Sequence, residues 1–299
     1  QDASVALGPD EVNHVKTRHA GDGTLFPMRI ARYVVGEDPV YGVVELAADG
    51  GEHPDTVRTL TGDPLAGPVK YTGERLHLDD VRLVAPVIPR SKVVAIGRNY
   101  VAHIRELGNE IPDAPVSFLK PNTSVIGPGE PIVYPNATKH VDHEGELAIV
   151  IGRICRDVPR DRVPEVIFGY TAANDVSARD LQKSDVQWGR AKGYDTFCPL
   201  GPWIVTHLSV DEASDLDITV TVEHADGLRE ERQHGNTGLM MRGIAELVEF
   251  VSSFCTLLPG DVILTGTPSG VGPIVAGDRV NVEISGIGVL SNPVVSQDA

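Results

Sequence analysis

The feature that most constrains this chain is a short segment in which two glutamates precede an unbroken apolar run. Glu144 and Glu146 stand two residues apart, directly before the run Leu147–Ile151. Such a run predicts a buried strand, and side chains at positions i and i+2 of a strand share one face. The two carboxylates are then about 7 Å apart. At an effective dielectric constant near 20, their repulsion is on the order of 2 kcal/mol.

Three arrangements relieve this repulsion: protonation of one carboxylate, access of both to water, or a cation between them. The third arrangement needs another ligand, and Asp175 is the best candidate because it follows the apolar strand predicted over 167–173. Three carboxylates plus water suit a hard octahedral cation such as Mg²⁺ or Mn²⁺. The alternative is that these are ordinary surface carboxylates on an edge strand.

His103 and Glu106 lie three residues apart on a helix predicted over 100–107, so they share one helix face. A carboxylate beside an imidazole raises its basicity and orients it, which is the arrangement of a general base. A surface ion pair is the alternative interpretation.

Three cations stand near these acidic positions in the sequence. Lys120 ends an apolar strand and is followed by proline, and Lys192 lies in a Gly-Arg-Ala-Lys-Gly segment. Arg179 falls in the first turn of a predicted helix, where the helix dipole disfavours a positive charge. We interpret these cations as candidates for binding an anion, against the alternative of plain surface charges.

A glycine-rich loop, 265–272, follows a predicted strand and contains Thr267. It lacks the Gly-Lys-Ser/Thr ending of a phosphate-binding loop. Its backbone amides and Thr267 are suited to holding a carboxylate, and a plain tight turn is the alternative.

His140 and His143 flank the two glutamates and raise a different metal hypothesis. Two histidines and one carboxylate are typical of a non-haem iron oxygenase. Solvated histidines in a loop are the interpretation that we favour.

Composition excludes several classes of partner and compartment. With 26 basic and 42 acidic residues the net charge is −16, which opposes binding to nucleic acid or to an anionic membrane. The three cysteines are too widely spaced for a disulfide framework or a zinc cluster. No apolar stretch reaches the length of a membrane span, and no signal pattern is present. We therefore expect a cytoplasmic protein.

Strand patterns outnumber helix patterns and do not alternate regularly with them, which disfavours Rossmann and TIM topologies. We predict a mixed, mostly β fold with a few short helices. The clearest elements are a hairpin over 217–233, a helix over 242–255, and a capping box at Ser177–Asp180. The predicted organisation is a polar extension (1–27), a small N-terminal subdomain (28–88) and a main domain (89–299).

Several motifs, each weak alone, occur in one order across residues 91–295, and together they resemble the fumarylacetoacetate hydrolase family. The motifs are Ala95–Tyr100 with His103 and Glu106, Phe118–Pro121, Glu144–Ala148, Asn174–Asp180, Lys192-Gly193 and Gly260–Pro268.

The resemblance implies a β roll, usually in a homodimer, and a role for each candidate residue. The implied metal ligands are Glu144, Glu146 and Asp175, for Mg²⁺ or Mn²⁺; the implied catalytic residues are His103, Glu106 and Lys192; the implied substrate contacts are Lys120, Arg179, Gln182 and Thr267.

The short form of the chain resembles bacterial acylpyruvate hydrolases, oxaloacetate decarboxylases and 2-hydroxyhepta-2,4-diene-1,7-dioate isomerases. The resemblance implies metal-dependent cleavage of a C–C bond in a small anionic 2-oxo acid, through a pyruvate enolate. An isomerase of aromatic catabolism is the first alternative, and a non-catalytic protein that binds a metal and a dicarboxylate is the second.

Overall fold

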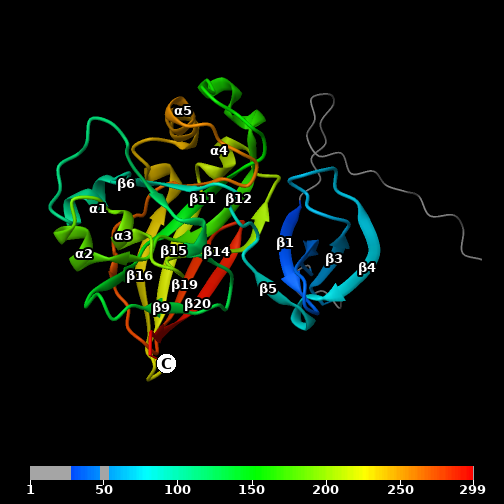
Figure 1. Cartoon of the computed structure of the whole chain (residues 1–299), viewed down its shortest axis with the longest axis horizontal. Helices are drawn as coiled ribbons and strands as arrows, with labels where there is room; N and C mark the ends of the chain where they lie inside the picture. The colour runs from blue at the N-terminus through cyan, green and yellow to red at the C-terminus, as the bar shows by residue number, and fades with distance from the viewer. Residues whose placement is uncertain (1–27, 48–53, 299) are drawn as a thin grey trace, which may run out of the picture.

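The computed structural model describes residues 28–47 and 54–298, and strands dominate it (Figure 1). The 1–27 extension predicted from the sequence lies outside the described residues. One large sheet consists of β1 (Arg29–Val34), β2 (Val40–Glu45), β3 (Thr56–Leu60), β4 (Tyr71–His77), β5 (Arg82–Val84), β6 (Val93–Gly97), β7 (Val116–Lys120), β8 (Val125–Ile126), β11 (Gly145–Ile151), β12 (Ile167–Asn174), β14 (Cys198–Val205) and β17 (Val262–Leu264).

Two smaller sheets complete the β structure. The five-stranded sheet consists of β9 (Ile132–Tyr134), β15 (Asp217–Glu223), β16 (Arg229–Asn236), β19 (Arg279–Ile284) and β20 (Gly288–Ser296), and the three-stranded sheet of β10 (Val141–His143), β13 (Ser177–Ala178) and β18 (Gly272–Pro273).

The helices are short and lie around the sheets. They are α1 (Val101–Glu106), α2 (Arg179–Ser184), α3 (Gly189–Lys192), α4 (Val210–Ala213) and α5 (Ile244–Phe254), with 3₁₀ turns η1 (Leu78–Asp80), η2 (Asn122–Ser124), η3 (Arg160–Glu165) and η4 (Thr237–Leu239). Figure 1 shows α1, α2 and α3 on one side of the molecule and β1, β3 and β4 on the other. The predicted mostly β fold is confirmed.

Strand β11 is an interior strand of the large sheet, between β12 and β17, and every one of its residues is buried. Because successive side chains alternate between faces, Leu147 and Ile149 enter one core and Ala148 and Val150 enter another. The first core also contains β15 and β19 of the five-stranded sheet. Glu146 lies two residues before Ala148 in the same strand, so its side chain points to the same face of the sheet, the face of the second core.

The N-terminal strands continue the large sheet. β1 pairs with β14 through Arg29 and Ile30, and the order then runs outward through β2, β3 and β4. Strands β3, β4 and β5 were not predicted from the sequence. In β4, most side chains are exposed, which leaves little apolar alternation to detect. The subdomain boundary at 88 stays a prediction.

Helix α5 matches the helix predicted over 242–255. Ile244, Leu247, Val248 and Val251 are buried as the apolar stripe requires. Phe254, near the end of the helix, is 48% exposed and packs edge-on against Phe250. Within the part of the chain that the structure describes, no helix combines the length and the apolar character needed to cross a bilayer.

Candidate functional site

Three acidic side chains meet where β11 begins and β12 ends. Gly145 pairs with Asn174, so the residues on either side of this pair are neighbours. The Asp175 N–H donates to the Glu144 carbonyl at 2.8 Å, and the Glu144 N–H donates to the Asn174 side chain at 2.9 Å. One carboxylate oxygen from each of Glu144, Glu146 and Asp175 lies within 4.8 Å of the others, and all three residues are buried.

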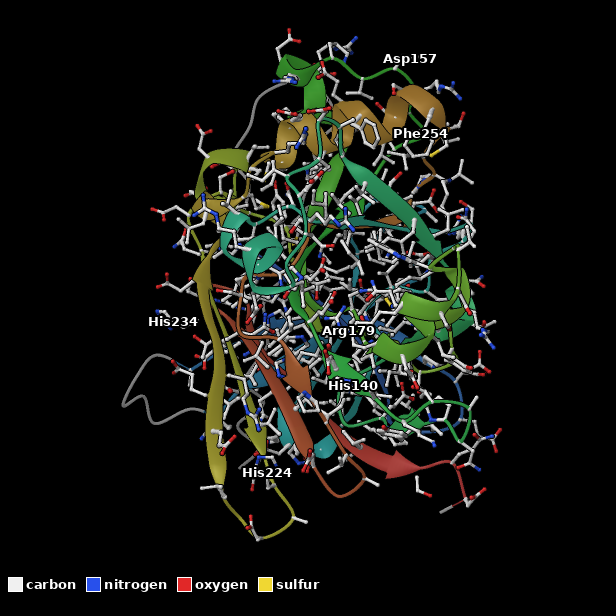
Figure 2. All side chains as sticks on the ribbon, turned by 90° about the vertical axis from the view of Figure 1, so that its left-hand side faces the viewer. His140, Asp157, Arg179, His224, His234 and Phe254 are labelled. Carbon is white, nitrogen blue, oxygen red and sulfur yellow. The ribbon has the colours of Figure 1, made fainter. Side chains whose placement is uncertain are left out.

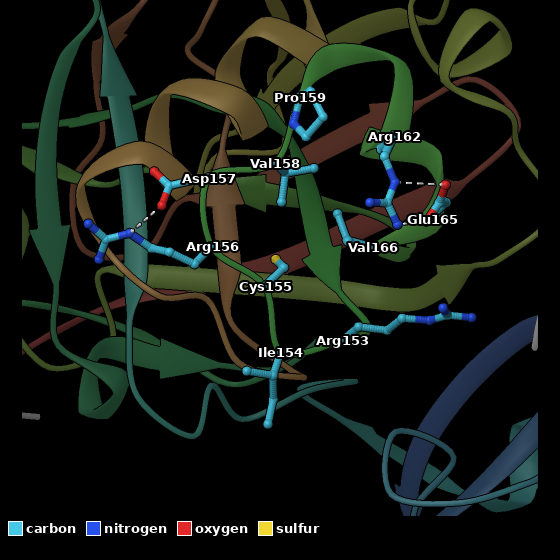
Figure 3. Close-up of a pocket in the computed structure, with 10 residues that line it drawn as sticks. All are labelled: Arg153, Ile154, Cys155, Arg156, Asp157, Val158, Pro159, Arg162, Glu165 and Val166. Carbon is cyan, nitrogen blue, oxygen red and sulfur yellow. Dashed lines mark hydrogen bonds and ion pairs between the residues drawn. The ribbon is translucent and has the colours of Figure 1, made fainter.

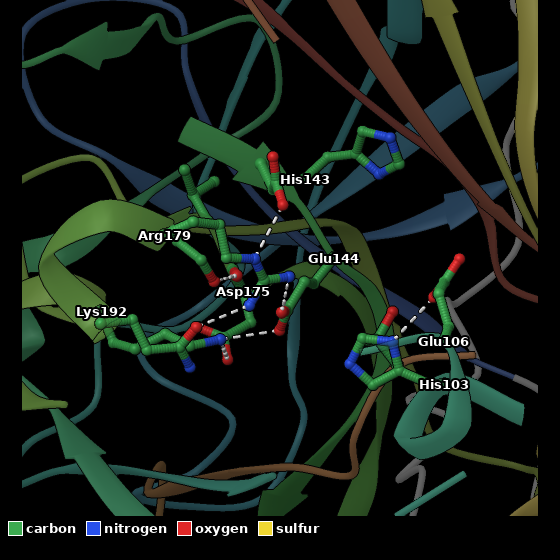
Figure 4. Close-up of polar contacts among 12 residues, drawn as sticks. His103, Glu106, His143, Glu144, Asp175, Arg179 and Lys192 are labelled. Carbon is green, nitrogen blue, oxygen red and sulfur yellow. Dashed lines mark hydrogen bonds and ion pairs between the residues drawn. The ribbon is translucent and has the colours of Figure 1, made fainter. Parts of the chain in front are cut away.

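The three candidate cations lie against this cluster (Figure 4). Lys192 Nζ donates to Glu144 Oε2 and to Asp175 Oδ2, both at 2.7 Å. Lys120 Nζ donates to Asp175 Oδ1, and Arg179 Nη2 pairs with Glu144 Oε1. Burial raises the pKa of Glu144, but the charges of Lys192 and Arg179 outweigh burial and hold that pKa below its usual range.

Glu146 differs from the other two carboxylates, because the described residues place no cation in an ion pair with it. Its Oε2 accepts from the Gly266 N–H at 2.7 Å. Burial, and then the charges of Asp175 and Glu144, raise the pKa of Glu146 well above its usual range. The charge of Lys192 and the Gly266 hydrogen bond lower the pKa of Glu146, but by less than burial and the two neighbouring carboxylates raise it.

The predicted base pair also reaches the site. His103 and Glu106 lie on α1, with His103 Nδ1 3.2 Å from Glu106 Oε2. His103 is 6% exposed, and its charge would act on Glu144. Glu106 Oε1 accepts from the Gly270 N–H at 2.9 Å, which ties α1 to the glycine-rich loop. Figure 4 shows the His103–Glu106 pair on the side of Glu144 opposite Lys192.

Arg179 lies in the first turn of α2, as predicted, and its guanidinium contacts three other side chains of the protein. Nε donates to Asp142 Oδ2 at 2.7 Å, Nη1 donates to Gln182 Oε1 at 2.9 Å, and Nη2 pairs with Glu144. This explains a cation at a helix start, because two carboxylates offset the unfavourable dipole. Figure 2 shows Arg179 inside the body, whereas His234 projects from its edge.

Thr267 is buried and bonded on both sides. Its hydroxyl donates to the Gly145 carbonyl at 2.9 Å and accepts from Gln233 at 2.8 Å. The single hydroxyl hydrogen is thus already used, so a substrate contact at Thr267 would have to donate to it. The roles of Gln182 and Thr267 toward a substrate stay predictions.

The capping box predicted at Ser177–Asp180 is wrong. Ser177 lies in β13, and its hydroxyl donates to the Asp175 carbonyl at 2.9 Å. Helix α2 begins after Ala178, which provides no side-chain cap. The serine therefore stabilises the turn that carries the third carboxylate instead of the helix.

Of the two histidines, His140 agrees with the favoured interpretation and His143 does not. The His140 side chain is 48% exposed and pairs with Asp142. His143 lies in β10 with no exposed surface, and its Nδ1 is 3.1 Å from Gln233 Oε1. Its ring points away from Glu144 in Figure 4, so the two-histidine iron hypothesis has no geometric support.

Gln233 is the residue that sequence reasoning missed. It has no exposed surface, and its amide bonds four groups from distant segments. Oε1 accepts from the Gly145 N–H and from His143, while Nε2 donates to Thr267 Oγ1 and to the Pro268 carbonyl. In the sequence, Gln233 is only a glutamine within a predicted strand, and that alone does not indicate a role at the site.

A separate surface pocket of about 370 Å³ lies at the opposite end of β11 from Glu146 (Figure 3). Two pairs of its charged side chains contact each other, Arg162 with Glu165 and Arg156 with Asp157. Nothing in this pairing selects a ligand, and the acidic cluster remains the candidate site.

Comparison with known proteins identifies the class of protein that this fold and site define. Residues 92–295 match the family model described as fumarylacetoacetate (FAA) hydrolase, C-terminal. Residues 28–86 match a second model, Rv2993c-like, N-terminal. The chain therefore belongs to the fumarylacetoacetate hydrolase family.

Individual relatives cover nearly all of the chain. Protein Rv2993c of Mycobacterium tuberculosis is 51% identical, over 90% of this chain and 98% of its own. The structure of 2-hydroxyhepta-2,4-diene-1,7-dioate isomerase from Mycobacterium marinum is 46% identical with a TM-score of 0.81, over 91% of this chain and 100% of its own.

A third match concerns the cofactor. The structure of maleylpyruvate hydrolase from Sphingobium sp. SYK-6, with manganese(II) and pyruvate, is 33% identical with a TM-score of 0.70. It covers 90% of this chain and 99% of its own. The predicted family and fold are confirmed. The relatives' names include both a hydrolase and an isomerase, so family membership does not select one reaction.

Proposed function

We propose that this protein is a divalent-metal-dependent enzyme that cleaves a C–C bond of a small 2-oxo acid. The observation that carries the proposal is the meeting of Glu144, Glu146 and Asp175, with Glu146 left unpaired by the described cations. An all-oxygen set of this kind suits Mg²⁺ or Mn²⁺. The related maleylpyruvate hydrolase structure holds manganese and pyruvate, which supports the same choice.

When bound, such an ion would act as a Lewis acid and stabilise the negative charge of a pyruvate enolate. The chain's own residues hold the ion and the anion. Glu144, Glu146 and Asp175 would supply the oxygen ligands. Lys192 supplies a positive charge beside them, because the charges of Asp175 and Glu144 outweigh burial and raise its pKa above the ordinary value.

His103 is the proposed general base for hydrolysis of an acylpyruvate. Because Nδ1 contacts Glu106, the other ring nitrogen is left to accept a proton from water. Glu106 then stabilises the imidazolium. The resulting hydroxide attacks the distal carbonyl carbon, the C3–C4 bond breaks, and its electron pair remains on the pyruvate fragment. That fragment takes up a proton at C3 and leaves as pyruvate.

Two related outcomes use the same site. Oxaloacetate loses carbon dioxide at its C3–C4 bond without water. Isomerisation of a 2-hydroxy diene dioate requires only proton transfer, and the name of the Mycobacterium marinum relative favours it as the second candidate. A non-catalytic dicarboxylate binder is a weaker proposal, because His103, Glu106 and Lys192 would then have no chemical role.

The test is a substrate panel with a chelator control. Acetylpyruvate, fumarylpyruvate, oxaloacetate and 2-hydroxyhepta-2,4-diene-1,7-dioate would be compared with Mg²⁺ or Mn²⁺ and after exhaustive chelation. The proposal expects turnover of at least one acylpyruvate or oxaloacetate that disappears on chelation and returns with metal. Conversion of the diene dioate alone would select the isomerase. A homodimer and a cytoplasmic location remain proposals, the first measurable by light scattering.

A further inference from the structure

Two neighbouring aromatic side chains, Phe118 and Trp188, lie beside the charged cluster, and we call them the aromatic wall. Phe118 and Lys120 are two residues apart in β7, so both side chains lie on the same sheet face. Lys120 reaches Asp175 from that face, and Lys192 Nζ lies 5.2 Å from the centroid of the Phe118 ring. Phe118 therefore borders the proposed position of the 2-oxo acid.

Trp188 extends this wall away from the cluster. Its ring centroid is 5.5 Å from that of Phe118, in an edge-to-face arrangement of 72°. The indole also lies over Gly97 of β6, where an added Cβ would be 2.8 Å from a Trp188 ring carbon. Both rings are partly exposed, so they form a surface that an apolar chain can contact.

Arg98 lies at the far end of the wall. Its guanidinium carbon is 5.8 Å from the Trp188 ring, and Nη2 donates to Asn109 Oδ1 at 3.0 Å. Asn109 is neutral, and the described residues provide no carboxylate in ion-pair distance of Arg98. Its φ of 57° is the left-handed region, which an arginine adopts at a cost of about 1–2 kcal/mol. Such conformations persist where the surrounding structure holds them, often at functional sites.

Arg98 differs from the cations at the acidic cluster, because each of those is already bonded to a carboxylate of the protein. Arg179 is bonded to Asp142 and Glu144, and both lysines are bonded to Asp175. A substrate's second carboxylate therefore finds no uncommitted cation at the cluster itself. Arg98 is charged, lies over the partly exposed Trp188 ring, and is bonded only to a neutral amide among the side chains that the structure describes.

We propose that Phe118, Trp188 and Arg98 form a subsite for the distal end of the substrate, and that the substrate is a 2-oxo dicarboxylic acid. The extended carbon chain lies along the two rings, and the distal carboxylate pairs with Arg98. This inference rests on the proposed function, because it places the 2-oxo end at the Glu144–Glu146–Asp175 cluster.

Calorimetric binding of unreactive ligands to the Mg²⁺-loaded protein tests this subsite. Oxalate reports on the cluster alone. Unbranched 2-oxo dicarboxylates of five to seven carbons, each beside the 2-oxo monocarboxylate of equal length, report on the distal carboxylate. In Arg98→Gln, we expect the affinity for the best dicarboxylate to fall at least 10-fold, with oxalate and the monocarboxylates changed less than 2-fold. Arg190→Gln is the matched control, because Arg190 is exposed and pairs with Asp185.

A Trp188→Leu variant separates the wall from the cation. It should weaken long monocarboxylates and dicarboxylates alike and leave oxalate unchanged. Equal affinity of Arg98→Gln and the unchanged protein for every dicarboxylate would overturn the subsite. So would a parallel loss of oxalate binding in Arg98→Gln, which would mean that Arg98 only positions the cluster. Failure of the unchanged protein to bind oxalate would overturn the proposed function and this subsite together.

Discussion

The backbone of Asp175 is hydrogen-bonded to the backbone of Glu144, 31 positions earlier in the chain, at 2.8 Å. This bond continues the β11–β12 pairing by one residue beyond the last strand pair. The acidic cluster is therefore assembled by strand register, and the three carboxylates are brought together before any ligand binds.

Glu144 and Glu146 should respond oppositely to neutralisation in chelator-treated protein. Glu144→Gln leaves Lys192 and Arg179 with one carboxylate fewer, and breaking a buried ion pair costs about 3–5 kcal/mol. Glu146→Gln removes a buried carboxyl group whose pKa is already raised, so stability should stay equal or increase. Urea unfolding measures both changes. Equal destabilisation by the two substitutions would contradict this assignment of the pairing.

The same two variants should both lose metal. Each removes one of the three proposed oxygen ligands, so we expect Mn²⁺ affinity to fall by at least 10-fold in each, as followed by the paramagnetic signal of free Mn²⁺. Asp185→Asn is the control, because Asp185 is acidic but pairs only with exposed Arg190 among the described cations. Its Mn²⁺ affinity should not change.

Gln233→Leu should weaken the site without altering any proposed ligand. The leucine leaves the Gly145 N–H and the His143 ring without their acceptor, and each buried unsatisfied group costs about 1–3 kcal/mol. We expect lower stability to urea and weaker Mn²⁺ binding, because Gly145 separates the two glutamates. Glu231→Leu, on an exposed position of the same strand, is the comparison. A Gln233→Leu protein with unchanged Mn²⁺ affinity would show that this amide does not position the site.

His103→Ala should separate hydrolysis from decarboxylation. Acylpyruvate hydrolysis needs water to be deprotonated, and loss of a general base costs about 10²–10⁴-fold in rate. Oxaloacetate decarboxylation needs no water, so it should persist within about 10-fold. Steady-state rates on both substrates provide the measurement. Unchanged acylpyruvate cleavage would refute the role of His103 in activating water.

The buried thiol should be chemically inert in the folded protein. Burial raises the pKa of Cys198 to about 12, and only the thiolate reacts quickly with disulfide reagents. Burial also raises the pKa of Cys155 and of Cys255. At pH 8 we expect Cys198 to react only after unfolding, whereas Cys155 and Cys255 are partly exposed. In Cys198→Ser, the number of thiols that react in the unfolded protein should fall to two, and the reaction of the folded protein should not change. Fast reaction of Cys198 in the folded protein would contradict its burial.

The sequence predicted the cluster because its signals are local. The apolar run after Glu146 specifies a buried strand, and residue order then fixes which side chains share a face. Asp175 could be placed because it ends a second apolar strand. The ordered motifs then assigned the family, which spacing alone could not do.

The sequence could not predict features that depend on contacts between distant segments. Gln233 and Gly145 are 88 residues apart, and neither residue type indicates that they meet. His143 was misjudged because a polar residue beside acidic neighbours suggests a loop, whereas its pairing with Gly272 places it in a buried sheet. Nothing in the sequence indicates that Asp142 is a carboxylate partner of Arg179, 37 positions away.

The most direct measurement is anomalous diffraction from crystals of this protein grown with Mn²⁺. We predict one strong anomalous peak per chain, at about 2.0–2.3 Å from an oxygen of each of Glu144, Glu146 and Asp175. A peak elsewhere, or none at saturating Mn²⁺, would contradict it.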